Sequence, residues 1–123
     1  MNGERTDLIN LIAKTSLSDL AAIIEMSKFV VTNETSAVHI ASALSVPAIC
    51  IIGGGHFGRF LPYQADVVNP KQRFPVVVNH PMECYGCNWH CIYGCDCNTP
   101  APCVTNIEVQ DIWKEVEKIL GHN

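Results

Sequence analysis

The stretch that decides the fold runs from Phe29 to Ala41 and reads Phe-Val-Val-Thr-Asn-Glu-Thr-Ser-Ala-Val-His-Ile-Ala. A short β-branched run stops at small polar residues, and a helical pattern of apolar residues begins at once. This order is typical of a buried parallel strand that leads directly into the amino terminus of a helix. Because a helix amino terminus offers free N–H groups and the positive end of the helix dipole, the junction predicts a site for anions, phosphate above all.

Strands and helices alternate through the first eighty residues. A capping box of Ser16 and Asp19 predicts where the first helix begins. In the second helix, Val38, Ala41 and Leu44 are expected to face the sheet. The predicted fold class is therefore α/β, a Rossmann-like open parallel sheet with flanking helices. The expected elements are an edge strand at 8–12, a helix at 17–27, a strand at 29–31, a helix at roughly 35–45 and strands at 48–52 and 76–78.

The rest of the chain is predicted to be a cysteine-rich loop over residues 81–104 and a C-terminal helix over 105–121. Thr105 and Glu108 form a second candidate capping box, and Gly121 is expected to end the helix. All 123 residues are predicted to form one domain. The helix carries an apolar stripe of Val109, Ile112, Trp113, Val116, Ile119 and Leu120.

Composition narrows the class of partner. Eight Lys and Arg stand against twelve Asp and Glu, for a net charge of −4, and no basic run occurs. A nucleic-acid partner is therefore not expected. No segment approaches the ~18 consecutive apolar residues of a membrane span, and residues 1–5 lack the apolar core of a signal peptide. These features predict a cytoplasmic protein.

Six of the seven cysteines lie between Cys84 and Cys103. The spacing Cys84-x2-Cys87 is that of metal ligands, so a structural zinc site is one interpretation. A set of reduced thiols in a loop is the other, and the sequence leaves both open. The remaining candidate ligands are Cys91, Cys95, Cys97, Cys103, His80 and His90.

Two turns, Asn33–Ser36 and Gly53–Arg59, follow neighbouring strands and are expected to line one crevice. The N–H groups of Thr35, Ser36 and Ala37 are candidates to hold phosphate, although an ordinary helix cap uses the same residue types.

Further candidate ligand contacts lie at or near these turns, and each has a structural alternative. Glu34 and His39 could bind a ligand, or could be a solvated carboxylate and a histidine bonded internally. His56 and Arg59 could neutralise a diphosphate, or be solvated loop residues. The last two candidates, Lys14 and Thr15, follow the first predicted strand.

Three blocks in this order, at 10–24, 30–44 and 47–53, resemble family 9 glycosyltransferases, the ADP-heptose:lipopolysaccharide heptosyltransferase family. The family segment Thr-Asn-Asp-Thr-Gly-Pro-Met-His aligns with residues 32–39, where Glu34 replaces the usual Asp and Ser36 the usual Gly. The blocks 53–63 and 84–91 are similar to a branch found in polysaccharide gene clusters. The resemblance implies a partial C-terminal, donor-binding half of a GT-B fold, without the acceptor domain that carries the presumed base. Such a fragment is expected to be inactive alone, and its catalytic residues are unknown.

The resemblance also implies an activity. It is inverting transfer of a sugar from a nucleotide-diphosphate donor, similar to ADP-heptose, to lipopolysaccharide or another cell-surface glycan or lipid-linked acceptor in bacteria. No metal or other cofactor is expected for catalysis. Glu34 would accept hydrogen bonds from the sugar, and Thr35, Ser36 and Ala37 would hold the diphosphate. The alternatives are a non-catalytic nucleotide- or phosphate-binding module and a cysteine-rich zinc module. Peripheral association with the inner membrane and a homodimer through an exposed sheet edge are further expectations.

Overall fold

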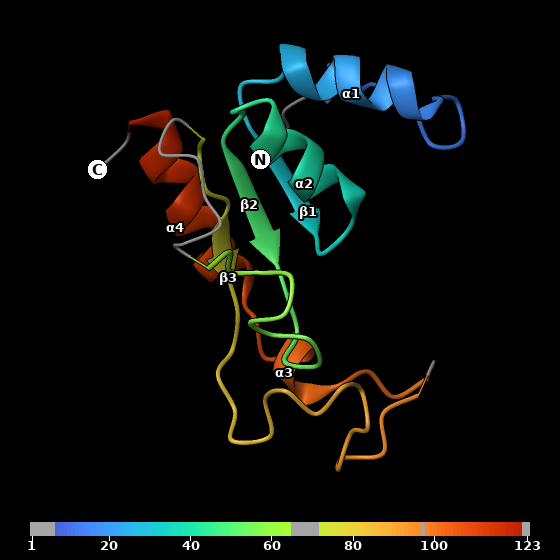
Figure 1. The fold of residues 1–123 in the computed structure, drawn as a ribbon, viewed down its shortest axis with the longest axis vertical. Helices are drawn as coiled ribbons and strands as arrows, with labels where there is room; N and C mark the ends of the chain where they lie inside the picture. The colour runs from blue at the N-terminus through green and yellow to red at the C-terminus, as the bar shows by residue number, and fades with distance from the viewer. Residues whose placement is uncertain (1–6, 65–71, 97, 122–123) are drawn as a thin grey trace.

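The computed structural model describes residues 7–64, 72–96 and 98–121 (Figure 1). Its sheet has three parallel strands in the order β1-β2-β3, so the predicted α/β class is confirmed. Four helices accompany the sheet in the described residues. The elements are α1 (Leu17–Met26), β1 (Val30–Asn33), α2 (Ser36–Ala43), β2 (Ala48–Ile51), β3 (Val76–Val78), α3 (Pro102–Thr105) and α4 (Val109–Leu120).

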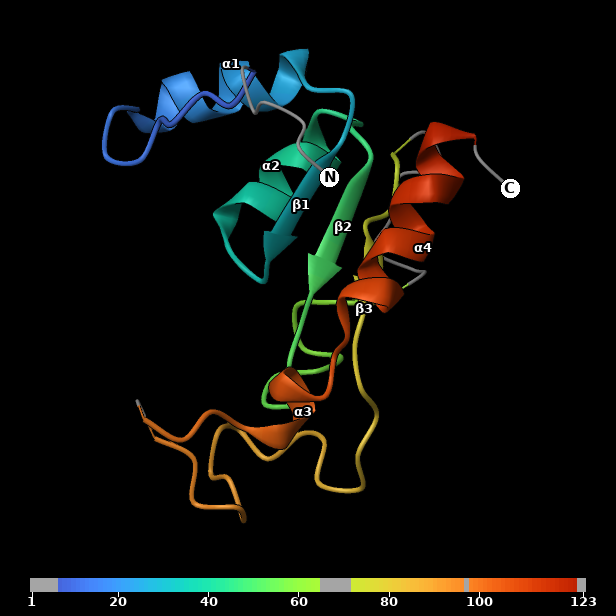
Figure 2. The ribbon, with the colours of Figure 1, turned by 180° about the vertical axis from the view of Figure 1, so that it is seen from behind.

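Helices cover both faces of the sheet. α2 packs on β1 and β2 with α1 against it, whereas α4 packs on β2 and β3, and the two opposite views place α2 and α4 on opposite faces (Figures 1 and 2). Side chains of β2 alternate between the two faces of the sheet. Ala48 and Cys50 pack in the core under α2, and Ile49 packs in the core under α4. A central strand buried on both faces explains why this run is apolar throughout.

The start of α1 follows the predicted capping box. The Ser16 hydroxyl accepts the Asp19 N–H at 3.1 Å, and the Asp19 carboxylate accepts the Ser16 N–H at 2.8 Å. The Ser16 hydroxyl also donates to the Asp19 carboxylate at 2.7 Å. The hydrogen bonds that this carboxylate accepts, first from the Ser16 N–H and then from the Ser16 hydroxyl, lower the pKa of Asp19.

The predicted cap of the last helix is wrong. Thr105 belongs to α3, a separate turn that begins at Pro102, and Glu108 is itself the N-cap of α4, paired with Asp111. Because proline favours the first position of a helix, Pro102 starts α3 as a separate short helix. The apolar spacing of α4 does not show that this helix precedes it. The end at Gly121 is confirmed, with a left-handed φ of 77°.

Two apolar predictions are also wrong. Residues 8–12 do not form a strand: no strand within the described ranges pairs with them, and their side chains are exposed. Leu44 does not face the sheet: α2 ends one residue before it, and Val46, whose N–H bonds the Ala41 carbonyl at 2.9 Å, fills the core instead. In α4, Val109 and Trp113 are exposed, so the apolar stripe is narrower than expected.

The cysteine-rich segment, residues 81–104, lies at the end of the sheet toward which the strands point (Figures 1 and 2). There α3 lies beside the turn that follows β2. Across the described residues, no helix combines the length and apolar character that a membrane span requires.

Candidate functional site

A pocket of about 260 Å³ opens at the carboxyl ends of β1 and β2. The two strands are in register, with Asn33 opposite Ile51, so the turns that follow them start side by side as expected. The cysteine-rich segment closes the pocket from a third direction. The lining residues are Asn33, Glu34, Ile51, Ile52, Gly53, Trp89 and Val104.

Glu34 supplies the only acidic group among these lining residues. Its Oε1 atom is buried and has no hydrogen-bond partner among the residues that the structure describes. A buried carboxylate oxygen without a donor is costly, so it calls for a partner outside the protein's own groups. Glu34 is thus prepared to accept hydrogen bonds from a ligand in the pocket.

The amino terminus of α2 follows Glu34 directly. Thr35 is the N-cap, with extended backbone angles, but its hydroxyl caps no N–H and lies 3.2 Å from the Thr32 hydroxyl. Within the described residues, the N–H groups of Ser36 and Ala37 therefore have no hydrogen-bond acceptor. Two free donors at the positive end of a helix are suited to a phosphate oxygen.

His39 is bonded within the protein. Its Nδ1 lies 2.6 Å from the Tyr63 hydroxyl, and the two rings are in tilted contact. The structure therefore gives one ring nitrogen an internal partner, and His39 is not among the residues that line the pocket.

His56 and Arg59 lie beyond the lining residues, in the turn after β2. His56 Nε2 lies 2.8 Å from the Asn88 Oδ1, and the ring makes edge contacts with Phe60 and Trp89. Arg59 is exposed, with its guanidinium 5.2 Å from the centre of the Phe60 ring. His56 thus contacts the pocket through a wall residue, whereas Arg59 is an exposed cation that lies against Phe60.

Lys14 and Thr15 are not brought to the pocket. Both are exposed and precede α1, which lies at the opposite end of the sheet from the strand tips (Figures 1 and 2). Their assignment as donor contacts stays a prediction without support from the described residues.

Besides Ile51 and Ile52 at the end of β2, the sequence reasoning missed Trp89 and Val104 in the pocket wall. Both come from the cysteine-rich segment, far along the chain from the turns they meet. The available signal was the run Gly53-Gly54-Gly55, where a Cβ on any of the three would press on that segment's side chains. Three glycines in a row can mark a close approach of another part of the chain.

The cysteine cluster does not assemble a metal site among the described residues. No group of three or more His, Cys, Asp or Glu side chains in them is placed to hold an ion, and Cys97 lies outside the described residues. A hydrogen bond from the Cys95 thiol lowers the pKa of Cys91, and the Cys103 thiol accepts the Gly54 N–H at 3.3 Å. The zinc interpretation stays a prediction.

Burial of Cys50 is expected to make the free energy of unfolding fall as the pH becomes alkaline. Burial, with the nearby Glu34 carboxylate, raises the pKa of this thiol to about 11. The unfolded chain releases the same proton near its ordinary pKa of about 8.5 to 9. Since the unfolded state then binds fewer protons, the free energy of unfolding should fall by up to about 2 kcal/mol between pH about 9 and 11. Urea denaturation of the wild type and Cys50→Ala should show a steeper loss for the wild type; parallel curves would contradict the assignment.

Comparison with known proteins agrees with this geometry. The sequence model of glycosyltransferase family 9 (heptosyltransferase) matches residues 1–85, which include α1, both strand–turn junctions and the turn after β2. No curated protein and no solved structure matches the chain. The match spans more than half of the 123 residues. The chain therefore belongs to glycosyltransferase family 9, the heptosyltransferase family.

Proposed function

We propose that the pocket holds the sugar end of a nucleotide-diphosphate sugar and that this chain is the donor-binding part of an inverting glycosyltransferase. The observation that carries the proposal is the buried Oε1 of Glu34 in the pocket wall, which has no hydrogen-bond partner in the described part of the chain. Glu34 stands two residues before the start of α2, whose first N–H groups find no acceptor among the residues that the structure describes. A hydroxyl-bearing ring joined to a diphosphate matches both features.

The charges of the site favour a ligand whose sugar binds at Glu34 and whose diphosphate binds at the start of α2. A carboxylate repels phosphate but accepts hydroxyl donors, so Glu34 is suited to the sugar. The Ser36 and Ala37 N–H groups are suited to the diphosphate. As the donor bond breaks, negative charge grows on the diphosphate, and N–H groups fixed by the helix stabilise that charge. The exposed Arg59 is available to a diphosphate that extends out of the pocket.

The proposed reaction is a single displacement. The acceptor hydroxyl oxygen forms a bond to the anomeric carbon, and the bond from that carbon to the diphosphate oxygen breaks, its electron pair leaving with the diphosphate. The hydroxyl proton passes to a base that we assign to no residue of this chain. The proposed donor is similar to ADP-heptose, and the proposed acceptor is lipopolysaccharide or another cell-surface glycan.

Calorimetric titration with ADP-heptose and with ADP tests the proposal. Glu34→Gln keeps the size of the side chain but removes its charge, so the affinity for ADP-heptose should fall about tenfold while that for ADP changes less than about twofold. Glu25→Gln, on the exposed side of α1, is the matched control and should bind both as the wild type does. If the wild type binds neither ligand, nor UDP-glucose or GDP-mannose, the donor-site proposal is wrong.

A further inference from the structure

Trp89 forms part of the pocket wall and keeps 46% of its surface exposed. It belongs to the cysteine-rich segment, after the residues that match the family. Its indole N–H has no hydrogen-bond acceptor among the described residues, in contrast to Trp113, whose N–H bonds Glu117 at 3.0 Å. Trp89 thus lines the pocket with a large aromatic side chain that the protein covers only in part.

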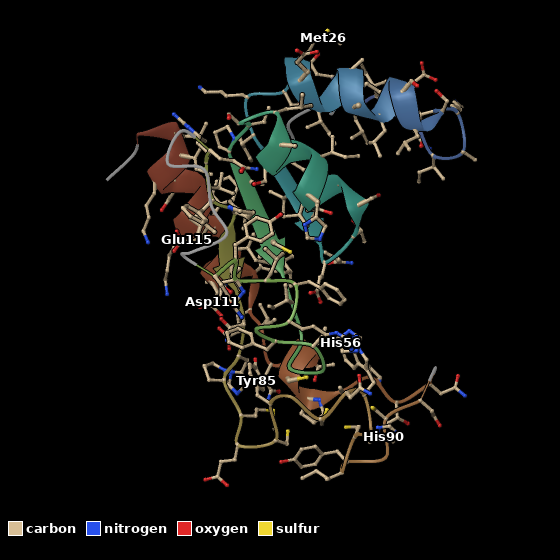
Figure 3. The ribbon with its side chains drawn as sticks, in the orientation of Figure 1. Met26, His56, Tyr85, His90, Asp111 and Glu115 are labelled. Atoms are coloured by element: carbon tan, nitrogen blue, oxygen red, sulfur yellow. The ribbon has the colours of Figure 1, made fainter. Side chains whose placement is uncertain are left out.

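The ring is held in place by backbone contacts with the glycine run. The Gly86 N–H donates to the Gly54 carbonyl at 2.8 Å, and the Asn88 N–H donates to the Gly55 carbonyl at 2.9 Å. A Cβ on Gly55 would overlap the Trp89 indole, so the ring lies directly on that backbone. Figure 3 labels His56, from the turn after β2, and Tyr85, from the cysteine-rich segment, at this end of the sheet.

The backbone at Trp89 and at the residue before it is strained. Asn88 and Trp89 are consecutive and both have left-handed φ angles, of 50° and 63°. Asparagine tolerates this region, but a bulky residue such as tryptophan rarely adopts it. Such strain persists only where surrounding contacts impose it, and it often occurs at ligand sites.

Clamping the segment to the sheet does not require Trp89. Tyr85 already packs against Gly54 and Phe57, and its hydroxyl donates to the His80 carbonyl. Tyr85 is also less exposed than Trp89. Tyr85 is therefore bonded into the protein, whereas Trp89 lines the pocket and remains partly exposed.

We propose that Trp89 is the surface on which the sugar ring of the donor stacks; this inference rests on the proposed function. A pyranose ring has an apolar C–H face and a rim of hydroxyl groups. The indole of Trp89, with Ile51 and Val104 nearby in the wall, suits the C–H face, and Glu34 suits the hydroxyl rim. The pocket of about 260 Å³ is smaller than the ~300–1,000 Å³ typical of drug-sized ligands, so it fits one ring rather than a whole nucleotide sugar. Trp89 thus makes the cysteine-rich segment a determinant of donor-sugar specificity.

The test compares ADP-heptose with ADP on Trp89 variants. Trp89→Ala should weaken ADP-heptose about tenfold and ADP less than about twofold, because only the sugar meets the indole. Trp89→Phe, which keeps an aromatic face, should stay within about threefold of the wild type for both ligands. In a Trp113→Phe background Trp89 is the single tryptophan, and ADP-heptose but not ADP should change its fluorescence.

The outcomes separate the two proposals. If the wild type binds none of ADP-heptose, ADP, UDP-glucose and GDP-mannose, both proposals fail; if it binds UDP-glucose or GDP-mannose instead, the same variants are compared on that nucleotide sugar and its nucleotide. If it binds both the nucleotide sugar and the nucleotide, and Trp89→Ala weakens them equally or not at all, the stacking proposal alone is overturned. Thermal denaturation of each variant checks folding. Should Trp89→Ala unfold, the Trp89→Phe affinities and the single-tryptophan fluorescence decide: an ADP-heptose signal without an ADP signal supports stacking, and equal signals overturn it.

Discussion

Gly54→Ala is expected to detach the cysteine-rich segment from the sheet and to lower the free energy of unfolding by about 3 kcal/mol, the upper part of the range for overpacking. The added Cβ would lie only 2.3 Å from Cδ1 of the Tyr85 ring, against the body of the ring rather than a flexible end. The ring cannot turn away freely because its hydroxyl is bonded to His80 and its face meets Phe57. The carbonyl of Gly54 also accepts a hydrogen bond from the Gly86 N–H. A shift of the Gly54 backbone would therefore also disturb the backbone of the cysteine-rich segment.

Two measurements follow this change. Urea denaturation gives the free energy of unfolding, and alkylation by iodoacetamide reports on Cys103, a buried thiol that accepts the Gly54 N–H. The alkylation rate of Cys103 should rise in Gly54→Ala. Gly58→Ala is the matched control: its φ of 81° is left-handed, but nothing lies within 4 Å of the added Cβ. It should cost about 1 kcal/mol of backbone strain and leave Cys103 protected. Equal losses in both variants would show that crowding by Tyr85 is not the cause.

Local patterns predicted several parts of the fold, although the Thr105–Glu108 capping box, also a local pattern, was wrong. The β-branched runs gave the three strands, and the Ser16–Asp19 capping box gave the start of α1. Both signals reside within a few residues, so no knowledge of neighbours is needed. The end of α4 at Gly121 was predictable for the same reason.

Two predictions failed because the apolar pattern on which they rested was not enough to decide them. Residues 8–12 have the composition of a strand, yet a strand needs another strand beside it, and composition does not supply that. Leu44 and Val46 lie two residues apart, and only the left-handed turn at Ser45, with φ of 58°, decides which one enters the core. A positive φ at serine is not visible from apolar spacing.

The pocket divides in the same way. Glu34 and the start of α2 were predictable because one short stretch holds the strand end, the turn and the helix start. Trp89 and Val104 were not, because their place depends on how a loop with little regular structure folds back on Gly53 and Gly55. The contact is between glycine, which has no side chain, and an aromatic ring, so no complementary pair of side chains appears in the sequence.

Ile49→Ala is expected to lower the free energy of unfolding by about 3–4 kcal/mol, within the range for truncating a fully buried aliphatic residue. Ile49 is 0% exposed and packs with Val78 and Val116, which joins the central strand β2 to α4. Alanine leaves a cavity at the centre of this second core, and the sheet and α4 cannot both move to close it. Urea denaturation followed by circular dichroism measures the loss.

Val31→Ala is the matched control for this core, because Val31 is the register partner of Ile49 on β1 and is 44% exposed. Val31→Ala removes apolar atoms from the neighbouring strand but leaves little cavity, because the side chain is partly exposed. It should therefore lower the free energy of unfolding by about 1 kcal/mol or less. A similar loss in the two variants would mean that α4 does not bury Ile49. A small domain has only about 5–15 kcal/mol of stability in total. Loss of the Ile49 contact alone would therefore remove a large share of it, and α4, which depends on this core, should be the first element to detach.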